Sequence, residues 1–388
     1  MLDSISTASK QFTLDADQIA VREMARAFAA EVFAPNAIAW DEAKHFPVAE
    51  MRKAAALGMG GIFVAEDRGG SSLSRLTGTL IFEALATGCP TTAAFMSIHN
   101  MVAGLIDAFG SDEQRQRWLP KLCAMDLLAS YCLSEPGAGS DAAALATRAT
   151  RDGDNYVLKG QKQFISGAGA SDLYLVMART SGEGPSGISA FLVPGDTPGL
   201  SFGANERKMG WNAQPTRAVI FEDARVPAAN RLGAEGTGFK IAMAGLDGGR
   251  LNIAACSLGG AQSALDKTLA YMSNRKAFGR RLDEFQALQF RLADMATQVE
   301  ASRALLWQAA AAFDRKDANA TRLSAMAKRF VTDACFEVAN QALQLHGGYG
   351  YLAEYGIEKI VRDLRVHQIL EGTNEIMRLI VARSLVGR

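Results

Sequence analysis

The feature that most constrains the fold of this sequence is a long series of mainly apolar residues near the C-terminal end, spaced by alternating steps of three and four. The series comprises Phe285, Leu288, Leu292, Met295, Val299, Ser302, Leu306, Ala309 and Phe313. This spacing places its members on one side of a helix and is typical of the seam of a helical bundle. A second stripe, at Leu323, Met326, Phe330, Ala334 and Val338, predicts a neighbouring helix. Residues 236–388 are therefore predicted to form a C-terminal helical bundle domain.

The pattern changes between residues 126 and 235. Short β-rich runs, at 127–133, 156–159, 173–178, 188–193 and 218–221, stand between turn dipeptides such as Asp152-Gly153 and Pro198-Gly199. Strands of this length and spacing suit an antiparallel barrel or sandwich and do not suit parallel βαβ units. This stretch is predicted to be a middle β-barrel domain.

The first 125 residues have helical patterns. Asp15 offers an N-cap with Gln18 three residues later, and the Ala-rich run 19–33 follows. Further apolar clusters occur at 51–57, 76–86 and 93–109, and residues 113–122 suit one more short helix. The order of helical, β and helical regions predicts an α+β protein, with an N-terminal helical domain at 1–125, the β-barrel domain at 126–235 and the bundle at 236–388.

The charge balance argues against several functions. Acidic and basic residues number 41 each, and no dense basic block occurs, so neither a nucleic acid nor an anionic membrane is an expected partner. No apolar run reaches the roughly 18 residues that a membrane span needs. The start of the chain resembles neither a signal peptide nor a transit peptide. A soluble, cytoplasmic protein is the expectation.

No metal site is expected from the cysteines and histidines. The cysteines, at 89, 123, 132, 256 and 335, are scattered and lack CxxC spacing, which favours small core residues in a reducing compartment. The histidines, at 45, 99, 346 and 367, are too far apart for a local ligand pair such as HExxH. A role as a capping, core or surface residue is therefore expected for each histidine rather than a role as a metal ligand.

Two motif matches lack the context that they require. Residues 182–187 match GxGxxG, but a β run follows them where a dinucleotide-binding motif needs a helix, so a hairpin loop is predicted. Residues 199–203 match GxSxG around Ser201, yet no helix follows the serine as a nucleophile elbow requires. An edge strand is predicted there.

Three other segments carry polar groups suited to chemistry. The loop after the first β run, 131–141, joins hydroxyls to several glycines, which allow backbone to approach a ring or a phosphate closely. Phe164 and Ser166 close a later β run. On the residues alone, an ordinary glycine turn is the favoured interpretation of the first segment, and the second segment by itself indicates no particular function.

The third segment surrounds Glu371. A helical stretch at about 357–369 breaks at Gly372, and a new helix is predicted from Thr373 to Leu385, so Glu371 is expected in a loop at a helix N-terminus. A solvated surface residue is the usual fate of a glutamate. Apolar neighbours such as Leu370 and Ile376 make partial burial plausible, and burial would raise the pKa of Glu371 and make it a tunable base.

Taken together, these segments resemble the acyl-CoA dehydrogenase family. The resemblance is carried by YCLSEPGAGSD, QKQFISGAG, NRKAFGRRLDEFQALQFRLADM, QLHGGYGY and LEGTNEIMRLIVARS, in the order and at the spacings of that family. It covers the chain from about residue 14 and implies the same order of three domains. Within the family, GWNAQPTRAVIFEDARVP, LDGGRLNIAACSLGGAQ and VRDLRVHQILEGTNEIMR are most similar to members that act on isobutyryl-CoA.

The resemblance implies a set of residues for an FAD cofactor. Those expected at the flavin end are Tyr131, Leu133, Ser134, Gly139, Ser140, Phe164, Ile165, Ser166, Thr373 and Glu375, with Ser134 at the pyrimidine and Ser166 near N5. Those expected to hold the pyrophosphate and adenosine across a subunit interface are Arg275, Phe278, Gln286, Gln344, Gly347 and Gly348. On the residues alone, a surface salt bridge is the alternative for Arg275. Many relatives have Trp at Phe164 and Thr at Ser134.

The resemblance also implies the catalytic and substrate residues. Glu371 matches the base that removes the substrate α-proton while the β-hydride passes to flavin N5, and Gly249 stands where some relatives carry that base instead. The residues implied for acyl-CoA are Ser140, Asp247, Gly248, Arg250, Leu370 and Gly372. Leu370 replaces a common Tyr and opens space near Cα–Cβ, which suits conversion of isobutyryl-CoA to methacrylyl-CoA, with valine breakdown as the expected pathway. The expected partners are an electron-transfer flavoprotein and three further copies of the chain in a homotetramer.

Several alternatives stay open on the sequence. A relative acting on 2-methylbutyryl-CoA or on straight short chains differs only by small changes in the acyl pocket, and one methylene is worth only about 1–3 kcal/mol of discrimination. An acyl-CoA oxidase of similar fold would differ in using O₂ to reoxidise the flavin. A serine hydrolase at Ser201 would react with a phosphonate probe, and a flavin-free helical scaffold would be colourless.

Overall fold

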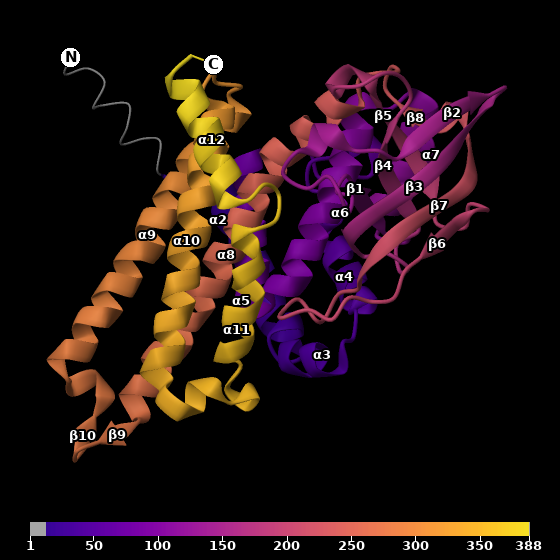
Figure 1. The fold of residues 1–388 in the computed structure, drawn as a ribbon. Coiled ribbons are helices and arrows are strands. Elements are labelled where there is room, and N and C mark those ends of the chain that lie inside the picture. Colours follow the sequence, from indigo (N-terminus) through magenta and orange to yellow (C-terminus); the bar gives the residue numbers. More distant parts are fainter. Residues whose placement is uncertain (1–12, 388) are drawn as a thin grey trace.

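The structure, a computed structural model, describes residues 13–387. Its α+β fold has the predicted order, in which helices precede and follow a sheet (Figure 1). The N-terminal helices are α2 (Ala16–Phe28), α3 (Ala37–Ala43), α4 (Val48–Ala54), α5 (Arg75–Gly88), α6 (Pro90–Phe109) and α7 (Asp112–Cys123). The predicted cap of α2 is confirmed, because Asp15 and Gln18 form a reciprocal capping box. The start of the chain, where no targeting segment was predicted, lies mostly outside the described residues.

The sheet contains eight strands. They are β1 (Ala129–Cys132), β2 (Arg148–Asp152), β3 (Asn155–Ser166), β4 (Leu173–Arg179), β5 (Ile188–Pro194), β6 (Leu200–Phe202), β7 (Thr216–Pro227) and β8 (Arg231–Leu232). Their order is β6-β7-β3-β2-β4-β5-β8, and β1 pairs with β4. The predicted antiparallel pairing is confirmed for β2–β3, β3–β7, β4–β5, β5–β8 and β6–β7, but it was wrong for β1 and β2, which both run parallel to β4. A parallel pair needs a long connection, which the β2–β3 hairpin supplies between β1 and β4.

Both rejected motifs have the predicted form. The GxGxxG match is the loop that joins the antiparallel partners β4 and β5, and it ends in a single 3₁₀ turn at Pro185–Gly187. Ser201 lies in β6, the edge strand beside β7. Neither segment leads into a helix, so neither has the backbone that a dinucleotide or a nucleophilic serine requires.

The C-terminal region is a helical bundle. It contains α8 (Gly238–Asn274), the hairpin of β9 (Lys276–Ala277) and β10 (Arg280–Arg281), α9 (Gln286–Asp314), α10 (Ala320–His346), α11 (Ile357–Arg365) and α12 (Asn374–Leu385). The seam of α9 is confirmed, since Met295, Val299, Ser302, Leu306 and Ala309 are all buried.

The stripe predicted for α10 was wrong in part. Met326 is 38% exposed, whereas the buried series of this helix runs through Ala325, Lys328, Val331 and Cys335. The physical reason is that α10 packs against α8, α9, α11 and α12, so its buried face is broad and is not fixed by one apolar stripe. A fully buried lysine inside that face went unpredicted.

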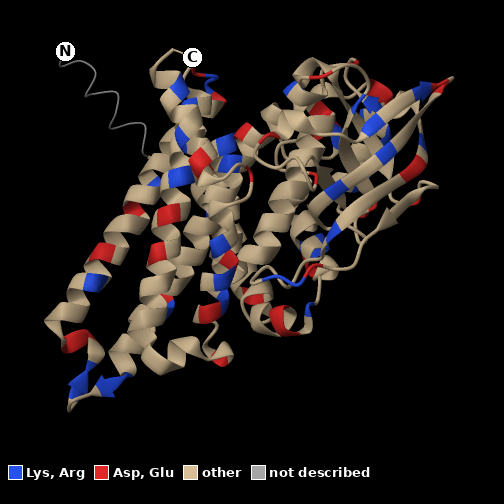
Figure 2. Cartoon of the chain, in the orientation of Figure 1, with Lys and Arg blue, Asp and Glu red and all other residues tan. Residues whose placement is uncertain are grey.

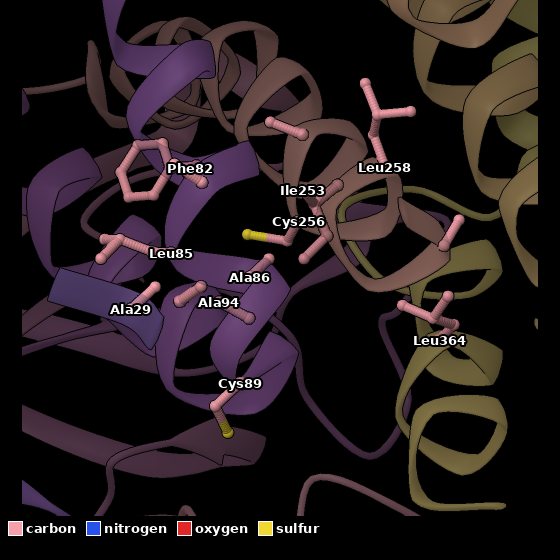
Figure 3. Close-up of a cluster of buried hydrophobic side chains, with 14 of the residues drawn as sticks. Ala29, Phe82, Leu85, Ala86, Cys89, Ala94, Ile253, Cys256, Leu258 and Leu364 are labelled. Carbon is pink, nitrogen blue, oxygen red and sulfur yellow. The ribbon is translucent and has the colours of Figure 1, made fainter. Parts of the chain in front are cut away.

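The N-terminal helices and the bundle share one hydrophobic core. Figure 3 shows Phe82 and Leu85 of α5 facing Ile253 and Cys256 of α8, with Leu364 of α11 nearby. All five cysteines are buried and free, as predicted for core thiols. The sheet therefore stands beside a helical body whose two parts are separated in sequence.

Charge is mixed over most of the molecule (Figure 2). The β9–β10 hairpin is an exception, because Lys276, Arg280 and Arg281 make its tip basic. Within the described residues, no helix has the length and apolar character to cross a bilayer, and no cluster of three His, Cys, Asp or Glu side chains could hold a metal ion.

Candidate active site

A cavity of about 390 Å³ lies where the sheet meets the helical body. It is lined from all three regions of the chain. The predicted residues that it brings together are Tyr131, Leu133, Ser134, Gly139, Ser140, Phe164, Ile165, Ser166, Arg250, Leu370, Glu371 and Gly372. Residues from four distant segments thus converge on one cavity.

Glu371 occupies an unusual backbone position in this cavity. Helical structure ends at Gln368, and α12 begins at Asn374, capped by the Thr373 side chain. Between them, Glu371 and Gly372 have φ values of 54° and 90°. Left-handed backbone is uncommon outside glycine and persists only where the surroundings hold it. The predicted loop at a helix N-terminus is confirmed, and its strained conformation is an additional finding.

The environment of the Glu371 carboxyl group tunes its proton affinity. The residue as a whole is half-buried, but its Oε2 is enclosed and has no hydrogen-bond partner among the described residues. Burial raises the pKa of Glu371 to about 7, while the positive charges of Lys328, Arg250 and Arg75 oppose the rise. A carboxyl group with this pKa can take up and release a proton near neutral pH.

Helix α8 forms the wall beside the base. A Cβ added at Gly249 would stand 2.5 Å from Glu371 Oε2, which is closer than a real contact. A Cβ at Gly248 would stand 2.7 Å from the Arg75 guanidinium. The two glycines therefore let a carboxyl group and a cation approach the helix backbone. Arg250, one residue further on, donates to Asp247 at 2.5 Å and to the Glu371 carbonyl oxygen at 3.4 Å.

The loop after β1 is held by a buried ion pair. The Glu135 carboxylate accepts hydrogen bonds from Lys162 Nζ at 2.7 Å and from the amides of Ala146 and Thr147 at 2.6 and 3.0 Å. Burial alone would raise the pKa of Glu135, but Lys162 and the hydrogen-bond donors hold it below its usual value. The Gln163 amide also donates to the Ser134 carbonyl oxygen at 2.9 Å. This network joins the two loops on the sheet side of the cavity.

The sheet side of the cavity leaves space for a planar group. Phe164 has a φ of 59°, and the residue is 67% exposed although it lines the cavity. A Cβ added at Gly137 or Gly139 would meet nothing within 4 Å, so nothing in this chain requires glycine there. Exposed aromatic surface beside a bare backbone fits a flat cofactor ring, and the free hydroxyl positions of the loop fit its polar edge.

A second pocket lies at the opposite end of the bundle, close to the β9–β10 hairpin in Figure 1. It brings together Arg275, Gln344, Gly347 and Gly348, four of the residues predicted for a pyrophosphate and adenosine. A Cβ at either glycine would again meet open space. Phe278, at the hairpin tip, is 96% exposed, and Gln286 starts α9 without lining this pocket.

The remaining predicted residues lie near the first cavity without lining it. Asp247 pairs with Arg250, and Gly248 packs against Arg75. Thr373 caps α12, and Glu375 is exposed in its first turn. Sequence reasoning named Ile376 as an apolar neighbour of Glu371 but missed the rest of the apolar wall of the cavity, formed by Ile98, Met101, Trp211, Phe239, Met243, Leu246 and Ile380. No chemical signal marks such residues, because their types are those of any core.

Two cations near Glu371 were also missed. Arg75 lies over the Phe63 ring at 3.6 Å and donates to Asn252, and burial lowers its pKa to about 10. Lys328 is fully buried on α10. A signal did exist for Lys328, because it falls in step with the buried positions Ala325 and Val331, where a charged residue is unexpected.

Comparison with known proteins matches most of the chain to one family. Profiles described as the N-terminal, middle and C-terminal domains of acyl-CoA dehydrogenase match residues 15–126, 130–224 and 236–386. Mitochondrial isobutyryl-CoA dehydrogenase of Bos taurus is 55% identical over 98% of this chain and 92% of its own length. The protein of that name in Dictyostelium discoideum is 57% identical over 96% and 90%.

A solved structure agrees over the same length. A chain from work on the electron transferring flavoprotein of Acidaminococcus fermentans, which addresses flavin-based electron bifurcation, superposes with a TM-score of 0.95 and 40% identity. The match covers 97% of this chain and all of that chain.

Proposed function

The chain belongs to the acyl-CoA dehydrogenase family, whose members are flavin-dependent oxidoreductases, and we propose that it dehydrogenates a short branched acyl-CoA between Cα and Cβ. The observation that carries this proposal is the Glu371 carboxyl group. It lies in a cavity with apolar walls, its pKa is raised to about 7 by burial, and one of its oxygens lacks a hydrogen-bond partner among the described residues. These are the properties of a general base poised for a weakly acidic carbon.

The cofactor would be FAD, held as the resemblance implies. Ser134, Phe164 and Ser166 would contact its ring system, where the bare backbone of the loop and the exposed phenyl ring leave space. When bound, the flavin accepts the hydride that leaves Cβ. Arg275 and Gln344 lie in the other pocket, which supports a second copy of the chain supplying the pyrophosphate contacts.

The chain's own residues perform the proton transfer and polarise the substrate. Glu371 removes the proton from Cα. Its backbone N–H donates to no acceptor among the described residues, so it is free to bind the thioester oxygen and stabilise the charge that develops there. Arg250 holds the Glu371 carbonyl oxygen and keeps a positive charge beside the base. The apolar walls exclude water and preserve the basicity of Glu371.

Isobutyryl-CoA is the proposed substrate. Two relatives named for that activity are 55% and 57% identical over nearly the whole chain. Leu370, next to the base, and Leu246 both line the cavity and give it apolar surface that suits an α-methyl branch. 2-Methylbutyryl-CoA and butyryl-CoA are the alternative substrates, because pockets of this kind discriminate poorly between acyl groups that differ by one methylene.

The electron acceptor, assembly and location are also proposals. An electron-transfer flavoprotein is the proposed acceptor, supported by the family and by the structural likeness to a chain from work on such a protein. A homotetramer is the proposed assembly. We propose a cytoplasmic location, although the two named relatives are mitochondrial.

The first test is the visible spectrum of the purified protein during anaerobic addition of isobutyryl-CoA. We expect a yellow protein whose flavin band bleaches within one turnover. Bleaching only by another acyl-CoA would keep the reaction and change the substrate. A colourless protein that takes up no added FAD would contradict the proposal. Reoxidation of the bleached enzyme by O₂ at the rate of turnover would identify an oxidase instead.

The role of Glu371 is tested by Glu371→Gln. This variant keeps the shape of the side chain but has no proton acceptor, so it should retain FAD and bind acyl-CoA while the rate of bleaching falls by a factor of about 10²–10⁴. The exposed Glu354→Gln serves as the matched control and should bleach at the normal rate. Bleaching of Glu371→Gln at the normal rate would remove the base from the mechanism.

A further inference from the structure

Lys328 is the buried cation that lies behind the catalytic loop. It belongs to α10, and its side chain is fully buried. Its Nζ donates to the Gly372 carbonyl oxygen at 2.8 Å and to Asn374 Oδ1 at 2.9 Å. Gly372 directly follows Glu371, and both have left-handed backbone. The lysine thus holds the carbonyl group at the end of the strained turn that presents the base.

Asn374 extends this contact into a link between two helices. It is the first residue of α12, and its Nδ2 donates to Asp333 Oδ1 at 2.7 Å and to Thr332 Oγ1 at 3.0 Å. Both acceptors lie one turn beyond Lys328 on α10. The start of α12 is therefore fixed to α10 by these hydrogen bonds. A buried network of this kind holds a backbone in one conformation when all of its members have partners.

Lys328 forms no ion pair with Gly372 or Asn374, the two residues that accept its hydrogen bonds. Both of its acceptors are uncharged, and Asp333 pairs with Arg329 and Arg378 instead. An uncompensated ammonium group is costly to bury, and burial lowers the pKa of Lys328 to about 8. The carboxyl group of Glu371 is the main charge that counters this effect. Base and lysine therefore stabilise each other's charged forms.

Several other charged groups face Glu371. Arg250, on α8, forms an ion pair with Asp247. Arg75, at the start of α5, lies near the negative charge of Asp314, whose carboxylate accepts a hydrogen bond from the Arg75 backbone N–H. Of the three cations, Lys328 lowers the pKa of Glu371 most. Among the described residues, no carboxylate lies within ion-pair distance of Lys328. Its removal should therefore be felt at the base more than the loss of either arginine charge.

We propose that Lys328 is a positioning residue of the reaction, which fixes the Glu371–Gly372 turn through the Gly372 carbonyl group and keeps the base ionised by placing a buried positive charge behind it. The inference rests on the proposed role of Glu371. It assigns two separable effects to one side chain, a hydrogen bond that shapes the loop and a charge that sets the pH at which the base works. A lysine that acted only through its hydrogen bonds would have the first effect alone.

The test compares Lys328→Gln, which can still donate a hydrogen bond but carries no charge, with Lys328→Arg, which keeps the charge. The matched control is Arg322→Met, which removes a charge from the same helix nearly two turns away. For each FAD-loaded variant, kcat/KM for isobutyryl-CoA is measured against pH. We expect the rising limb of the profile to move to higher pH in Lys328→Gln and to stay in place in the other two.

The expected size follows from the charge that is lost. A displacement of one pH unit would lower kcat/KM about tenfold on the acidic side of the limb and leave its value on the alkaline plateau almost unchanged. A uniform loss at every pH in Lys328→Gln, with an unmoved limb, would contradict the proposal. So would an equal displacement in Lys328→Arg. If Lys328→Gln fails to retain FAD, the pH profile of Lys328→Arg is used instead. The proposal requires its rising limb to stay in place, and a displaced limb in that variant would contradict the proposal.

A second readout does not depend on turnover. The difference in melting temperature between the protein and its Glu371→Gln variant changes with pH about the pKa of Glu371 in the folded state. Repeating that comparison in the Lys328→Gln background should move the midpoint to higher pH, and an unmoved midpoint overturns the proposal. Failure of the proposed function would be seen separately, because no acyl-CoA would bleach even the unaltered protein.

Discussion

The ionisation of Glu371 couples the chemistry of single residues to the stability of the fold. Its pKa is raised to about 7 in the folded protein, from an ordinary value of 4.5. Between these two values the folded protein binds more protons than the unfolded chain, so the stability due to this group falls as pH rises through that range. Above about pH 7 the base is ionised and the destabilisation is complete. The enzyme is therefore expected to be most active where this residue destabilises it most.

This coupling predicts a pH-dependent gain in stability for Glu371→Gln. Relative to the unaltered protein, the variant should gain nothing below about pH 4.5 and up to ~3 kcal/mol above about pH 7, less to the extent that solvent reaches the half-buried residue. Melting temperature measured across this range with saturating FAD would show the gain. A constant difference at every pH would contradict the raised pKa, and the exposed Glu354→Gln should show no such trend.

Sequence reasoning found Glu371 and missed Lys328 for a physical reason. The carboxyl group stands in a segment with a helix break, a glycine and a cap, and each of these leaves a mark on the local sequence. The lysine stands in mid-helix, and its partners Gly372 and Asn374 come from another element. Burial of a polar group by tertiary packing leaves only the faint sign of a charge in an apolar row.

Among the elements, the loop between β1 and β2 contains one half of a buried ion pair. Its Glu135 carboxylate and Lys162, on β3, are both buried and form an ion pair at 2.7 Å. Removing one partner leaves the other charge buried alone, which typically destabilises a protein by about 3–5 kcal/mol. Because the loop also places Ser134 and Gly139 at the cavity, a loss of order in the loop should weaken FAD binding.

Lys162→Met is therefore expected to lower both the melting temperature and the FAD content of the purified protein. Lys159→Met is the matched control, because that lysine lies on the same strand with its side chain 75% exposed. Combining Lys162→Met with Glu135→Gln should restore part of the stability by removing the orphaned charge. Normal FAD content in Lys162→Met would show that the loop holds its shape without the ion pair.

The pairing of elements was less predictable than their positions. Caps, turns and apolar spacing predicted α2, the loop before β5 and the edge strand β6. The parallel direction of β1 and β2 against β4 was missed, because the side-chain alternation of a strand is the same in either direction. Direction depends on which strands become neighbours, and that is decided by contacts between distant segments.

At the scale of the whole molecule, the residues implied for one cofactor are divided between two pockets at different ends of the bundle. A site completed by a second copy of the chain explains this division. Arg275→Ala should then weaken FAD binding while leaving the pH dependence of kcat/KM unchanged, and the neighbouring exposed Lys276→Ala should have little effect. Titration of the apoprotein with FAD measures the affinity.

Mixing Arg275→Ala with Glu371→Gln, at an FAD concentration too low to load Arg275→Ala alone, tests the sharing directly. Arg275→Ala keeps its own Glu371, and Glu371→Gln keeps its own Arg275, so a hybrid assembly would contain some sites with both residues. We expect activity to appear after subunit exchange between the two variants. Mixtures that stay inactive although exchange is verified would place both residues in sites of the same chain.

The core shared by α5, α6, α8 and α11 has a consequence for how the protein is made (Figure 3). A ribosome releases Phe82 and Leu85 long before it has produced Ile253 or Leu364, with the whole sheet coming between. The apolar surface of the early helices therefore stays exposed until α8 and α11 have been synthesised, and a growing chain in that state is prone to aggregate. Slow translation of the middle of the message would lengthen this interval, so the yield of folded enzyme should depend on chaperones that shield nascent helices.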